Sequence, residues 1–390
     1  MIACFAWTNL QLINISNAKV NLYPEEEADL YVRMGPHISG GLISAIKGMG
    51  IYKNVYTIDP IVLSYGKMRL GSVPVLKYFL LKRSYIKAYN ALMNNTCPAR
   101  SYSRVLMTWF YAENAFVLNY WAKHTDHLAI TLVDEGTGSY CYFKKELYFP
   151  MFMANSLKDR LRRKVTEGVI VKKLAKNIDS IALYRPEYCR KDIDYKKLTL
   201  PTVNKETNPV IHKLLLSAAG AVDPMSQIRY DKSRFIYFSL PSPEGASFDA
   251  TSNRILRNLI QESCPQEVIT KVHTGDPVHA QNFAAELENQ IFVDRQVYVF
   301  EGLYAQMAKA ENMVLVSCAS TATINPKFMF DQEPYVIFTY RLYDTYRQCG
   351  VERDDWIAAA LKDAYSDKSR VMIPNAMQEL RNMIHSIRGA

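Results

Sequence analysis

The sequence predicts an α/β protein of two domains, each built on a parallel β-sheet. Three observations lead to this class. Short apolar, strand-like runs alternate with helix-like runs through the first half of the chain. The same alternation returns after about residue 231, and a polar, proline-containing stretch separates the two halves. Buried strands that alternate with helices are typical of parallel sheets covered on both faces.

The composition is that of an ordinary globular protein. The chain has 390 residues, of which 49% are hydrophobic and 22% charged, so two domains can each bury a core. Lys and Arg exceed Asp and Glu by 47 − 38, or +9, which favours an anionic partner over drift toward mild basicity. Seven scattered cysteines without a CxxC pair indicate a reduced, cytosolic protein. We expect neither a signal peptide nor a membrane-spanning run.

The first domain is expected over residues 1–186. Its strand-like runs lie at residues 2–7, 28–34, 52–58, 104–110, 128–135 and 180–185, and its helix-like runs lie at 9–19, 39–49, 73–93 and 113–124. A charged stretch with prolines follows, and we interpret residues 187–230 as an interdomain linker.

The second domain is expected over residues 231–355, followed by a helical tail at 356–390. Its strand-like runs lie at residues 234–240, 267–273, 296–300, 312–318 and 334–340. The two halves together predict two Rossmann-like domains that face across a cleft. In such sheets, ligands bind outside the carboxyl ends of the strands.

Polar residues gather where the predicted strands end. In the first domain these are Thr8, Asn9 and Gln11 after the first strand, and the adjacent Asp134 and Glu135 after the fifth. Two neighbouring carboxylates repel each other, so we expect the pKa of at least one to be raised. The strand ends therefore predict one functional edge in this domain.

The second domain carries a histidine and a hydroxyl cluster at its strand ends. His273 follows Lys271, and a neutral imidazole serves as a base whereas an imidazolium stabilises a leaving phosphate. Ser317, Ser320 and Thr321 open a helix, where backbone N–H groups and hydroxyls bind anions. The simpler alternatives are a structural histidine and an ordinary N-cap.

Two apparent metal motifs are discounted. His124 and His127 lack a third ligand nearby and are interpreted as solvent-facing. The Asp-Ile-Asp triplet at 192–194 resembles a metal-binding DxD, but it lies in the expected linker rather than at a strand end. We therefore predict no metal site.

Basic residues cluster in the first half. Residues 67–90 contain no acid, and 158–176 contain eight basic residues against Asp159 and Glu167. A solvated helix face is the simple explanation for the second cluster, but two clusters in one domain favour a track for a polyanion. The basic residues expected to line that track are Lys67, Arg69, Lys77, Lys82 and Arg83.

These motifs resemble those of bacterial sialyltransferases of GT-B-like fold. That family shares an acidic pair before glycine, a histidine-proline segment and a serine/threonine pair. Here the counterparts are Asp134-Glu135-Gly136, His273 with Pro277, and Ser320-Thr321. Three residues separate His273 from Pro277, whereas the usual motif has none; this departure and the basic clusters look most like the capsular polysialyltransferases.

The resemblance implies an inverting, metal-independent glycosyltransferase of GT-B architecture without a cofactor. Its donor would be CMP-sialic acid and its acceptor an oligo- or polysialic acid chain in capsular polysaccharide synthesis. Glu135 would be the general base, Asp134 would tune its pKa, and His273 would stabilise the leaving CMP. The donor would be bound by Ser317, Ser320, Thr321, Glu301, Lys271 and Gly275, and the acceptor by the basic track with Thr8, Asn9 and Gln11.

The resemblance also implies a cytoplasmic protein at the inner face of the membrane, in contact with anionic lipid or capsule assembly proteins. An alternative within the enzyme class is transfer of a single sialic acid to a lipooligosaccharide or glycolipid. A non-catalytic polyanion-binding protein is a second alternative, which would leave the acidic pair unexplained. No nucleic-acid-binding motif is present. A hydrolase is disfavoured because adjacent carboxylates are poorly spaced to flank a glycosidic bond.

Overall fold

The structure is a computed structural model with two compact units. Unit 1 is Met1–Pro201 and unit 2 is Thr202–Ala390. The structure describes residues 1–33, 38, 40–58, 102–110, 117–119, 121–122, 125, 127–141, 172–219, 224–240, 246–273, 281–307, 310–344 and 351–389. The helix expected at 73–93 therefore lies outside the described residues.

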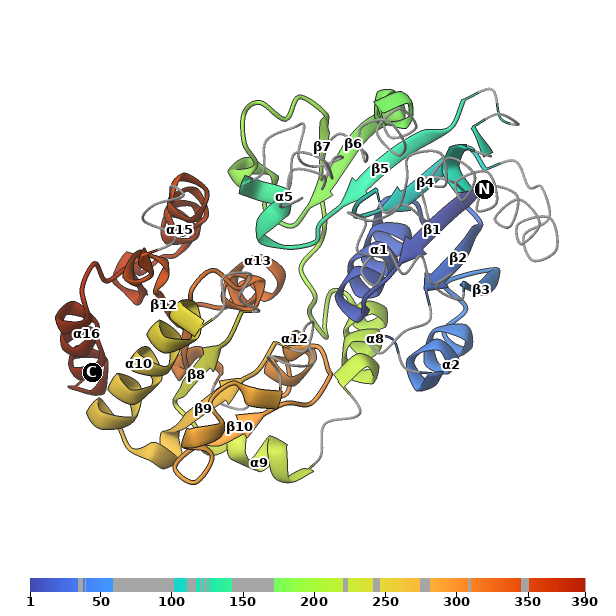
Figure 1. Cartoon of the computed structure of the whole chain (residues 1–390). Coiled ribbons are helices and arrows are strands. Elements are labelled where there is room, and N and C mark those ends of the chain that lie inside the picture. Colours follow the sequence, from blue (N-terminus) through green and yellow to red (C-terminus); the bar gives the residue numbers. More distant parts are fainter. Residues whose placement is uncertain are drawn as a thin grey trace, which may run out of the picture. The chain divides into compact units, whose positions relative to one another are not determined.

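Unit 1 contains a seven-stranded sheet in the order β3-β2-β1-β4-β5-β6-β7 (Figure 1). All of its strand pairs are parallel. The strands are β1 (Ile2–Ala6), β2 (Ala28–Arg33), β3 (Asn54–Ile58), β4 (Arg104–Met107), β5 (Ala129–Val133), β6 (Ile178–Leu183) and β7 (Lys196–Thr199). The described helices are α1 (Asn9–Leu22), α2 (Gly40–Gly48) and α5 (Thr137–Cys141).

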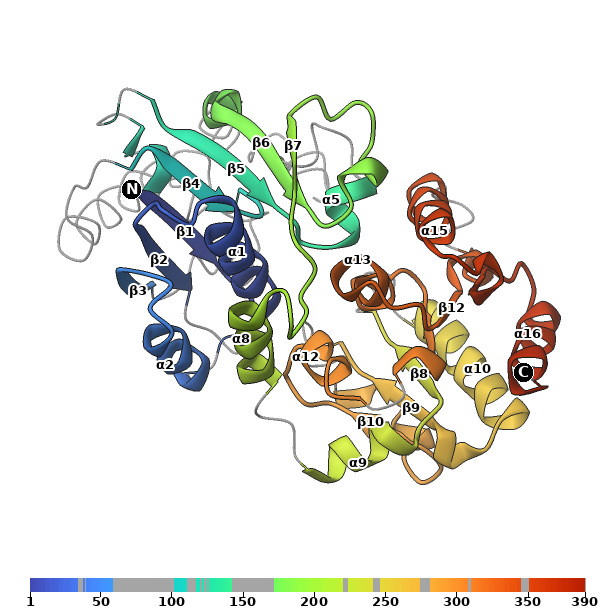
Figure 2. The ribbon, with the colours of Figure 1, turned by 180° about the vertical axis from the view of Figure 1, so that it is seen from behind.

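The central strands of this sheet are buried on both faces. Every residue of β1 is buried, and β4 and β5 are buried apart from their first residues. Helix α1 packs against β1, β4 and β5, as both ribbon views show (Figures 1 and 2). A strand covered on both faces must be apolar throughout, which explains the continuous runs in the sequence.

Unit 2 contains a six-stranded sheet in the order β10-β9-β8-β11-β12-β13, also with parallel pairs. The strands are β8 (Phe235–Phe238), β9 (Val268–Lys271), β10 (Phe292–Asp294), β11 (Val314–Ser317), β12 (Tyr335–Phe338) and β13 (Val371–Met372). The helices are α8 (Pro209–Ala219), α9 (Pro224–Lys232), α10 (Ala246–Glu262), α12 (Phe300–Tyr304), α13 (Asn325–Phe330), α15 (Glu352–Ala364) and α16 (Met377–Gly389).

The two sheets confirm the expected α/β class with two Rossmann-like domains. Each order runs outward from a central strand to one edge and then restarts beside that strand, which is the doubly wound pattern. The cleft expected between the domains stays a prediction.

The boundaries differ from the expected ones. Residues 187–230, expected as a linker, contain β7 on the first sheet and α8 and α9 of unit 2. Residues 356–390, expected as a tail, contain β13, which pairs with β12, and α16, which packs on α10. The strand expected at 296–300 is wrong, because β10 ends at Asp294 and α12 begins at Phe300. The edge strand β7 has a polar, mostly exposed sequence, which made it look like a linker. Helix α8 is apolar, with Ile211, Leu214 and Leu215 fully buried, and was missed because the polar stretch before it was extended too far.

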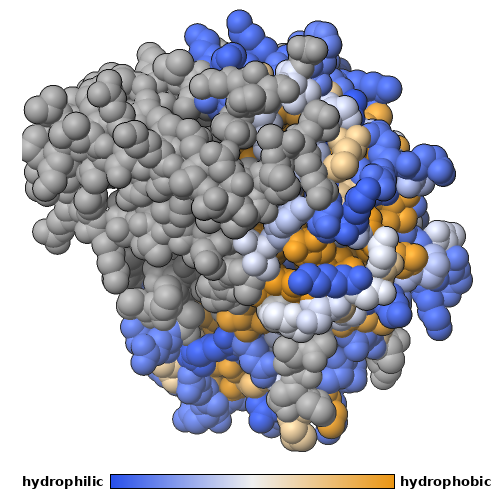
Figure 3. Space-filling view, turned by 90° about the vertical axis from the view of Figure 1, so that its right-hand side faces the viewer, coloured by the Kyte–Doolittle hydropathy of each residue, from blue (hydrophilic) through white to orange (hydrophobic). Residues whose placement is uncertain are grey.

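The described surface mixes hydrophilic and hydrophobic residues (Figure 3). The large hydrophobic side chains that are exposed are Val210, Met225, Ile228, Val297 and Trp356. Met225 and Ile228 lie one turn apart on α9. Some exposed apolar residues are normal on soluble proteins. Among the helices in the described ranges, none has the length and apolarity needed to span a bilayer.

Candidate functional site

Each sheet has one point at which the strand order reverses. In unit 1 this point lies between β1 and β4, and in unit 2 it lies between β8 and β11. The connections from neighbouring strands diverge there, which leaves a crevice beyond the carboxyl ends where ligands bind. Most of the predicted site residues that the structure describes follow strands at or beside these two points, so each unit has a candidate site of its own.

In unit 1 the turn after β1 is held by a variant of the capping box. The Thr8 hydroxyl accepts a hydrogen bond from Gln11 N at 3.2 Å and caps α1. The Gln11 Oε1 atom reaches back and accepts from Trp7 N at 2.9 Å. This is the pattern of Ser/Thr with Glu/Gln three residues later at a helix start. Thr8 and Gln11 therefore have structural roles besides the acceptor binding that we predicted.

Gln11 links this turn to the acidic pair after β5. Its Nε2 atom donates to Glu135 Oε1 at 2.7 Å. One turn further along α1, Asn14 Nδ2 donates to Asp134 O at 2.9 Å, and Glu135 N donates to Ser139 Oγ at 2.9 Å. Four of the predicted residues, Thr8, Gln11, Asp134 and Glu135, are thus brought together.

The Asp134 carboxylate is buried and holds the loop that follows it. Only 3% of the residue is exposed. Its Oδ1 accepts from Gly136 N at 2.7 Å, and its Oδ2 accepts from Tyr184 N at 3.3 Å and from the Tyr140 hydroxyl. Burial raises the pKa of Asp134 to about 6. We expected repulsion from Glu135 to be the cause, and this was wrong because desolvation dominates.

Gly136 has a backbone conformation that explains its identity. Its φ is +109°, a region that side-chain-bearing residues rarely adopt. This bend lets Gly136 N donate to Asp134 and starts α5. The glycine in the acidic motif is therefore required by the turn, whichever ligand the loop meets.

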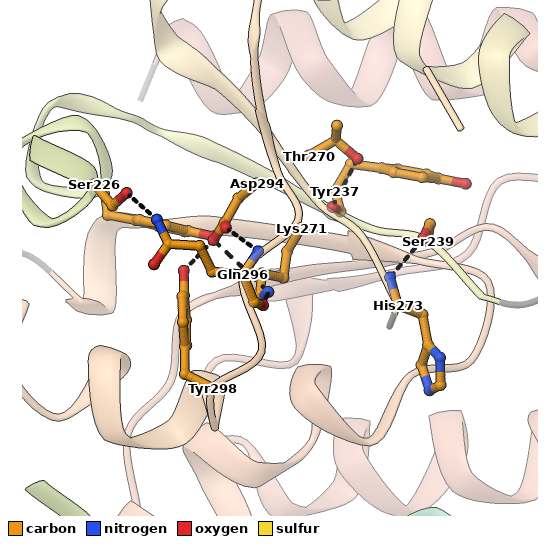
Figure 4. A network of polar contacts seen from close by, with 10 residues as sticks. Ser226, Tyr237, Ser239, Thr270, Lys271, His273, Asp294, Gln296 and Tyr298 are labelled. Carbon is orange, nitrogen blue, oxygen red and sulfur yellow. Dashed lines mark hydrogen bonds and ion pairs between the residues drawn. The ribbon is translucent and has the colours of Figure 1, made fainter. Parts of the chain in front are cut away.

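In unit 2 the His273 backbone is tied to Ser239. Ser239 directly follows β8, and it is buried at 3% exposure. Its hydroxyl accepts from His273 N at 2.9 Å, and its own N–H donates to Lys271 O at 3.1 Å (Figure 4). The His273 residue itself is exposed. Our sequence reasoning missed Ser239, although it is a polar residue at the end of a buried strand.

Lys271 belongs to a separate buried cluster. Its Nζ lies 3.8 Å from Asp294 Oδ2, donates to Gln296 O, and lies 4.3 Å from the centre of the Tyr298 ring. Asp294 also accepts from the Tyr230 hydroxyl at 2.7 Å. Burial lowers the pKa of Lys271. The His273 ring points away from this cluster in Figure 4, so the two side chains are not brought together.

The hydroxyl cluster after β11 is largely occupied by local hydrogen bonds. Ser317 Oγ accepts from Ser320 N at 2.9 Å, and Ser320 Oγ accepts from Ala322 N at 3.3 Å. Thr323 Oγ1 donates to Ser320 O at 2.6 Å. Ser320 is the N-cap of a three-residue 3₁₀ helix that starts at the half-buried Thr321. The simpler alternative, an ordinary N-cap, is thus correct for Ser320. Thr321 is the next residue and begins the 3₁₀ helix after β11.

Glu301 lies buried in the first turn of α12. Its Oε1 accepts from Asn325 Nδ2, the first residue of α13, at 2.5 Å. Burial raises the pKa of Glu301. Asn325 was not predicted, and only its place after the serine/threonine pair could have suggested it.

Several predicted residues lie outside the described part of the chain. These are Lys67, Arg69, Lys77, Lys82, Arg83, His124, Gly275 and Pro277, and what was expected of them stays a prediction. Asn9 is half-buried, and its Oδ1 has no hydrogen-bond partner among the residues that the structure describes. Within the described ranges, no group of three or more His, Cys, Asp or Glu side chains is placed to hold a metal ion. Asp192 pairs with Arg190 at 2.9 Å, and His127 is exposed.

No family model matches the chain, and no curated protein matches its sequence. Among solved structures, the chain is similar to S. aureus MnaA with UDP, at a TM-score of 0.49 and 10% identity over 98% of this chain and 93% of that one. It is also similar to an α/β-galactoside α-2,3-sialyltransferase from Photobacterium phosphoreum, at a TM-score of 0.48 and 10% identity over 95% and 98% of the chains. A third is the UDP-GlcNAc 2-epimerase from Neisseria meningitidis, at a TM-score of 0.46 and 11% identity over 99% and 90%. At such values the likeness carries no conclusion about the reaction.

Proposed function

We propose that the chain is a glycosyltransferase that moves sialic acid from CMP-sialic acid to the non-reducing end of an oligo- or polysialic acid chain. The proposed transfer inverts the anomeric centre and needs no metal. The observation that carries this proposal is the Glu135 carboxylate, which Gln11 holds at the carboxyl edge of the first sheet. The order of the sialyltransferase-like motifs along the chain supports the choice of CMP-sialic acid as the donor.

Unit 1 would supply the general base. The acceptor hydroxyl must lose a proton as it attacks the anomeric carbon, and a carboxylate at a sheet edge can take it. Glu135 is half-buried as a residue, whereas Asp134 is fully buried and bonded to Gly136, Tyr140 and Tyr184. We therefore assign the proton transfer to Glu135, and we assign to Asp134 the support of the loop. Asn9 Oδ1 is suited to accept a hydrogen bond from a sugar hydroxyl.

Unit 2 would supply the groups that stabilise the departing CMP. Negative charge develops on the phosphate as the bond to the sugar breaks, and fixed donors nearby lower the barrier. His273, Ser320 and Thr321 follow β9 and β11, which flank β8 in the sheet. Strands are spaced by about 4.8 Å, so these ends lie roughly 10 Å apart, which suits a nucleotide phosphate between them. Ser317, Glu301, Lys271 and Gly275 complete the proposed donor set.

The division of charge between the units supports an anionic acceptor. Unit 1 contains 28 Lys and Arg against 16 Asp and Glu, a net charge of 28 − 16 = +12. Unit 2 contains 19 against 22, a net charge of 19 − 22 = −3. The whole basic excess thus lies in the unit that carries the proposed base. A polyanion attracted to unit 1 is steered to Glu135, and this attraction weakens with salt.

The same charge supports a place at the cytoplasmic face of the membrane. Lysines near an anionic lipid surface each add about 1 kcal/mol of attraction. We propose that unit 1 contacts such a surface or the proteins of capsule assembly. Cosedimentation with vesicles of phosphatidylglycerol but not of phosphatidylcholine is the expected result, and equal recovery with both would contradict it.

The decisive experiment is incubation with CMP-sialic acid and a short oligosialic acid, followed by product sizing. We expect a ladder of extended products that persists after EDTA treatment. Glu135→Gln should abolish transfer while CMP binding remains, and Glu27→Gln, an exposed acid of the same unit, is the matched control. Substantial transfer by Glu135→Gln would refute the assignment of the base. Addition of one sugar only, to a glycolipid acceptor, would favour the single-transfer alternative.

A further inference from the structure

We propose that Gln11 is a positioning residue that holds the Glu135 carboxylate in its reactive orientation. This rests on the proposed function only in naming Glu135 as the base. Gln11 is 1% exposed, so its amide is shielded from water and from a bound sugar. Its Nε2 atom donates to Glu135 Oε1 at 2.7 Å, across 124 residues of sequence. Gln11 therefore acts on the reaction through Glu135.

The orientation of the amide follows from its other partners. Gln11 Oε1 accepts from Trp7 N at 2.9 Å, and a backbone N–H can only donate. The NH₂ group must then lie on the opposite side, where Glu135 is. A flipped amide would put its oxygen against the carboxylate and its NH₂ against Trp7 N–H, so both hydrogen bonds would be lost. The backbone of residue 7 thus sets which group faces Glu135.

The backbone on either side of Glu135 is held as well. Asn14 Nδ2 donates to Asp134 O, and Glu135 N donates to Ser139 Oγ. With the main chain fixed at both ends, the carboxylate has only its own side-chain torsions left to vary. The bond from Gln11 restricts them. Hydrogen bonds to an ionised carboxylate are short and strong, and they favour the charged form that a base needs.

The titratable and charged groups described around this loop include Asp134, Tyr140, Tyr184, Cys189 and Arg185. Cys189 Sγ donates to Ser139 O at 3.9 Å, and Arg185 N donates to the Tyr140 hydroxyl at 3.4 Å. The Asp134 carboxylate accepts from the Tyr140 hydroxyl and from Tyr184 N, and the Tyr184 hydroxyl donates to Asn14 Oδ1 at 2.8 Å. These groups therefore belong to the support beneath the loop. The neutral donor of Gln11 is a side-chain contact of Glu135 that can be changed without replacing any of these groups.

The substitution Gln11→Glu tests the proposal with little change of shape. Glutamate is as good as glutamine at this position of a capping box, and one of its oxygens can still accept from Trp7 N. The other oxygen replaces the donor 2.7 Å from Glu135. Two carboxylates this close share one proton, so the protonated form of the pair is favoured. We expect the acid limb of the pH profile of kcat/KM to move to higher pH by at least one unit. At pH values on that limb, kcat/KM should then be at least tenfold lower than in the wild type.

A second readout does not depend on activity. Protein labelled with ¹³C at glutamate carboxyls reports the titration of Glu135 directly by NMR, with Glu135→Gln used to assign the signal. Gln11→Glu and Gln11→Met, which has no donor, should both raise the pH at which Glu135 titrates by about one unit or more. Asn21→Asp is the control, since it adds a carboxylate to the same helix ten residues, or about 15 Å, away.

The outcomes separate this proposal from the proposed function. An unchanged Glu135 titration in a folded Gln11→Glu or Gln11→Met variant would overturn the positioning role, even if Glu135→Gln were inactive. A shifted titration together with full activity of Glu135→Gln would leave the positioning role intact and refute the base. If Gln11→Glu does not fold, the Gln11→Met measurement decides, with thermal unfolding as the check on folding.

Discussion

The buried carboxylate of Asp134 makes a quantitative prediction about stability and pH. Asp134 is 3% exposed and accepts from Gly136 N, Tyr184 N and the Tyr140 hydroxyl. The substitution Asp134→Asn removes the ionisable group but keeps one oxygen for Gly136 N. Its amide NH₂ can donate to the Tyr140 oxygen but cannot accept from Tyr184 N, which bonds the same oxygen of Asp134 in the wild type. The cost of this lost bond does not depend on pH, so it does not enter the comparison between pH values.

The sign follows from the direction of the shift. The pKa of Asp134 is raised in the folded protein from 3.8 to about 6, so the folded state binds more protons than the unfolded state between these values. Its ionisation therefore costs folding free energy as the pH rises from about 4 to about 6. About two pH units at 1.36 kcal/mol each amount to about 3 kcal/mol. Asparagine does not titrate. Between pH 4 and pH 7, the free energy of unfolding of the variant should therefore rise by about 3 kcal/mol relative to that of the wild type.

Urea unfolding at a series of pH values measures this difference. Tryptophan fluorescence is a suitable probe, because Trp7, Trp109 and Trp121 lie in unit 1 and only Trp356 lies in unit 2. Glu27→Gln serves as the control for loss of an exposed carboxylate. A difference between Asp134→Asn and the wild type that stays constant from pH 4 to pH 7 would refute the buried-carboxylate explanation.

Three further changes have expected outcomes. Gly136→Ala should destabilise the chain by about 1–3 kcal/mol in thermal unfolding, because the φ of +109° strains any residue with a Cβ; an unchanged melting temperature would contradict this. Glu333→Gln should cost about 1.5–3 kcal/mol at pH 7, since Glu333 accepts from Lys327 Nζ at 2.7 Å and from Ser366 N at 2.9 Å. The pKa of Glu333 is lowered from 4.5 to about 2, so this stabilisation is present above pH 4.5 and is lost as the pH falls toward 2. The stabilities of the wild type and of Glu333→Gln should therefore become equal in acid. His273→Ala should lower kcat by a factor of about 10²–10³ without changing the melting temperature, because the residue is exposed; a normal kcat would remove His273 from the site.

The fold was predictable because buried parallel strands carry a strong signal. The apolar runs of β1, β5 and β11 are continuous and short, and their length favours buried strands over helices. The edge strand β7 was missed for the opposite reason. Its residues Lys196–Thr199 are mostly exposed, so a sequence read for burial does not distinguish them from a linker. The apolar run at 296–300 misled us, since Val297 is exposed and Val299 leads into a helix.

The site was predictable in its members but not in their division of labour. Asp134 and Glu135 are adjacent and chemically alike, and sequence alone gives no reason to bury the first fully and leave the second half-buried. The difference arises from Tyr140 and Tyr184, which come from α5 and the end of β6 and meet the Asp134 carboxylate beneath the loop. Likewise, Gln11 could be seen as a helix-start residue, but its contact with Glu135 depends on the pairing of β1 with β4 and of β4 with β5.

The topology also explains why motifs that are individually weak can be informative together. In a doubly wound sheet, the strand order reverses once, and residues far apart in sequence are delivered to that point by parallel strands. Residues 8–11 and 134–136 meet in unit 1 because β1 and β5 both flank β4. Ser239, His273 and Ser320 follow three neighbouring strands of unit 2 in the same way. The useful signal is therefore the place of a polar residue directly after a buried strand near the reversal. Ser239 satisfies this rule as fully as Glu135 does. Its hydroxyl accepts from His273 N, so two residues that follow neighbouring strands are joined at this point of the sheet.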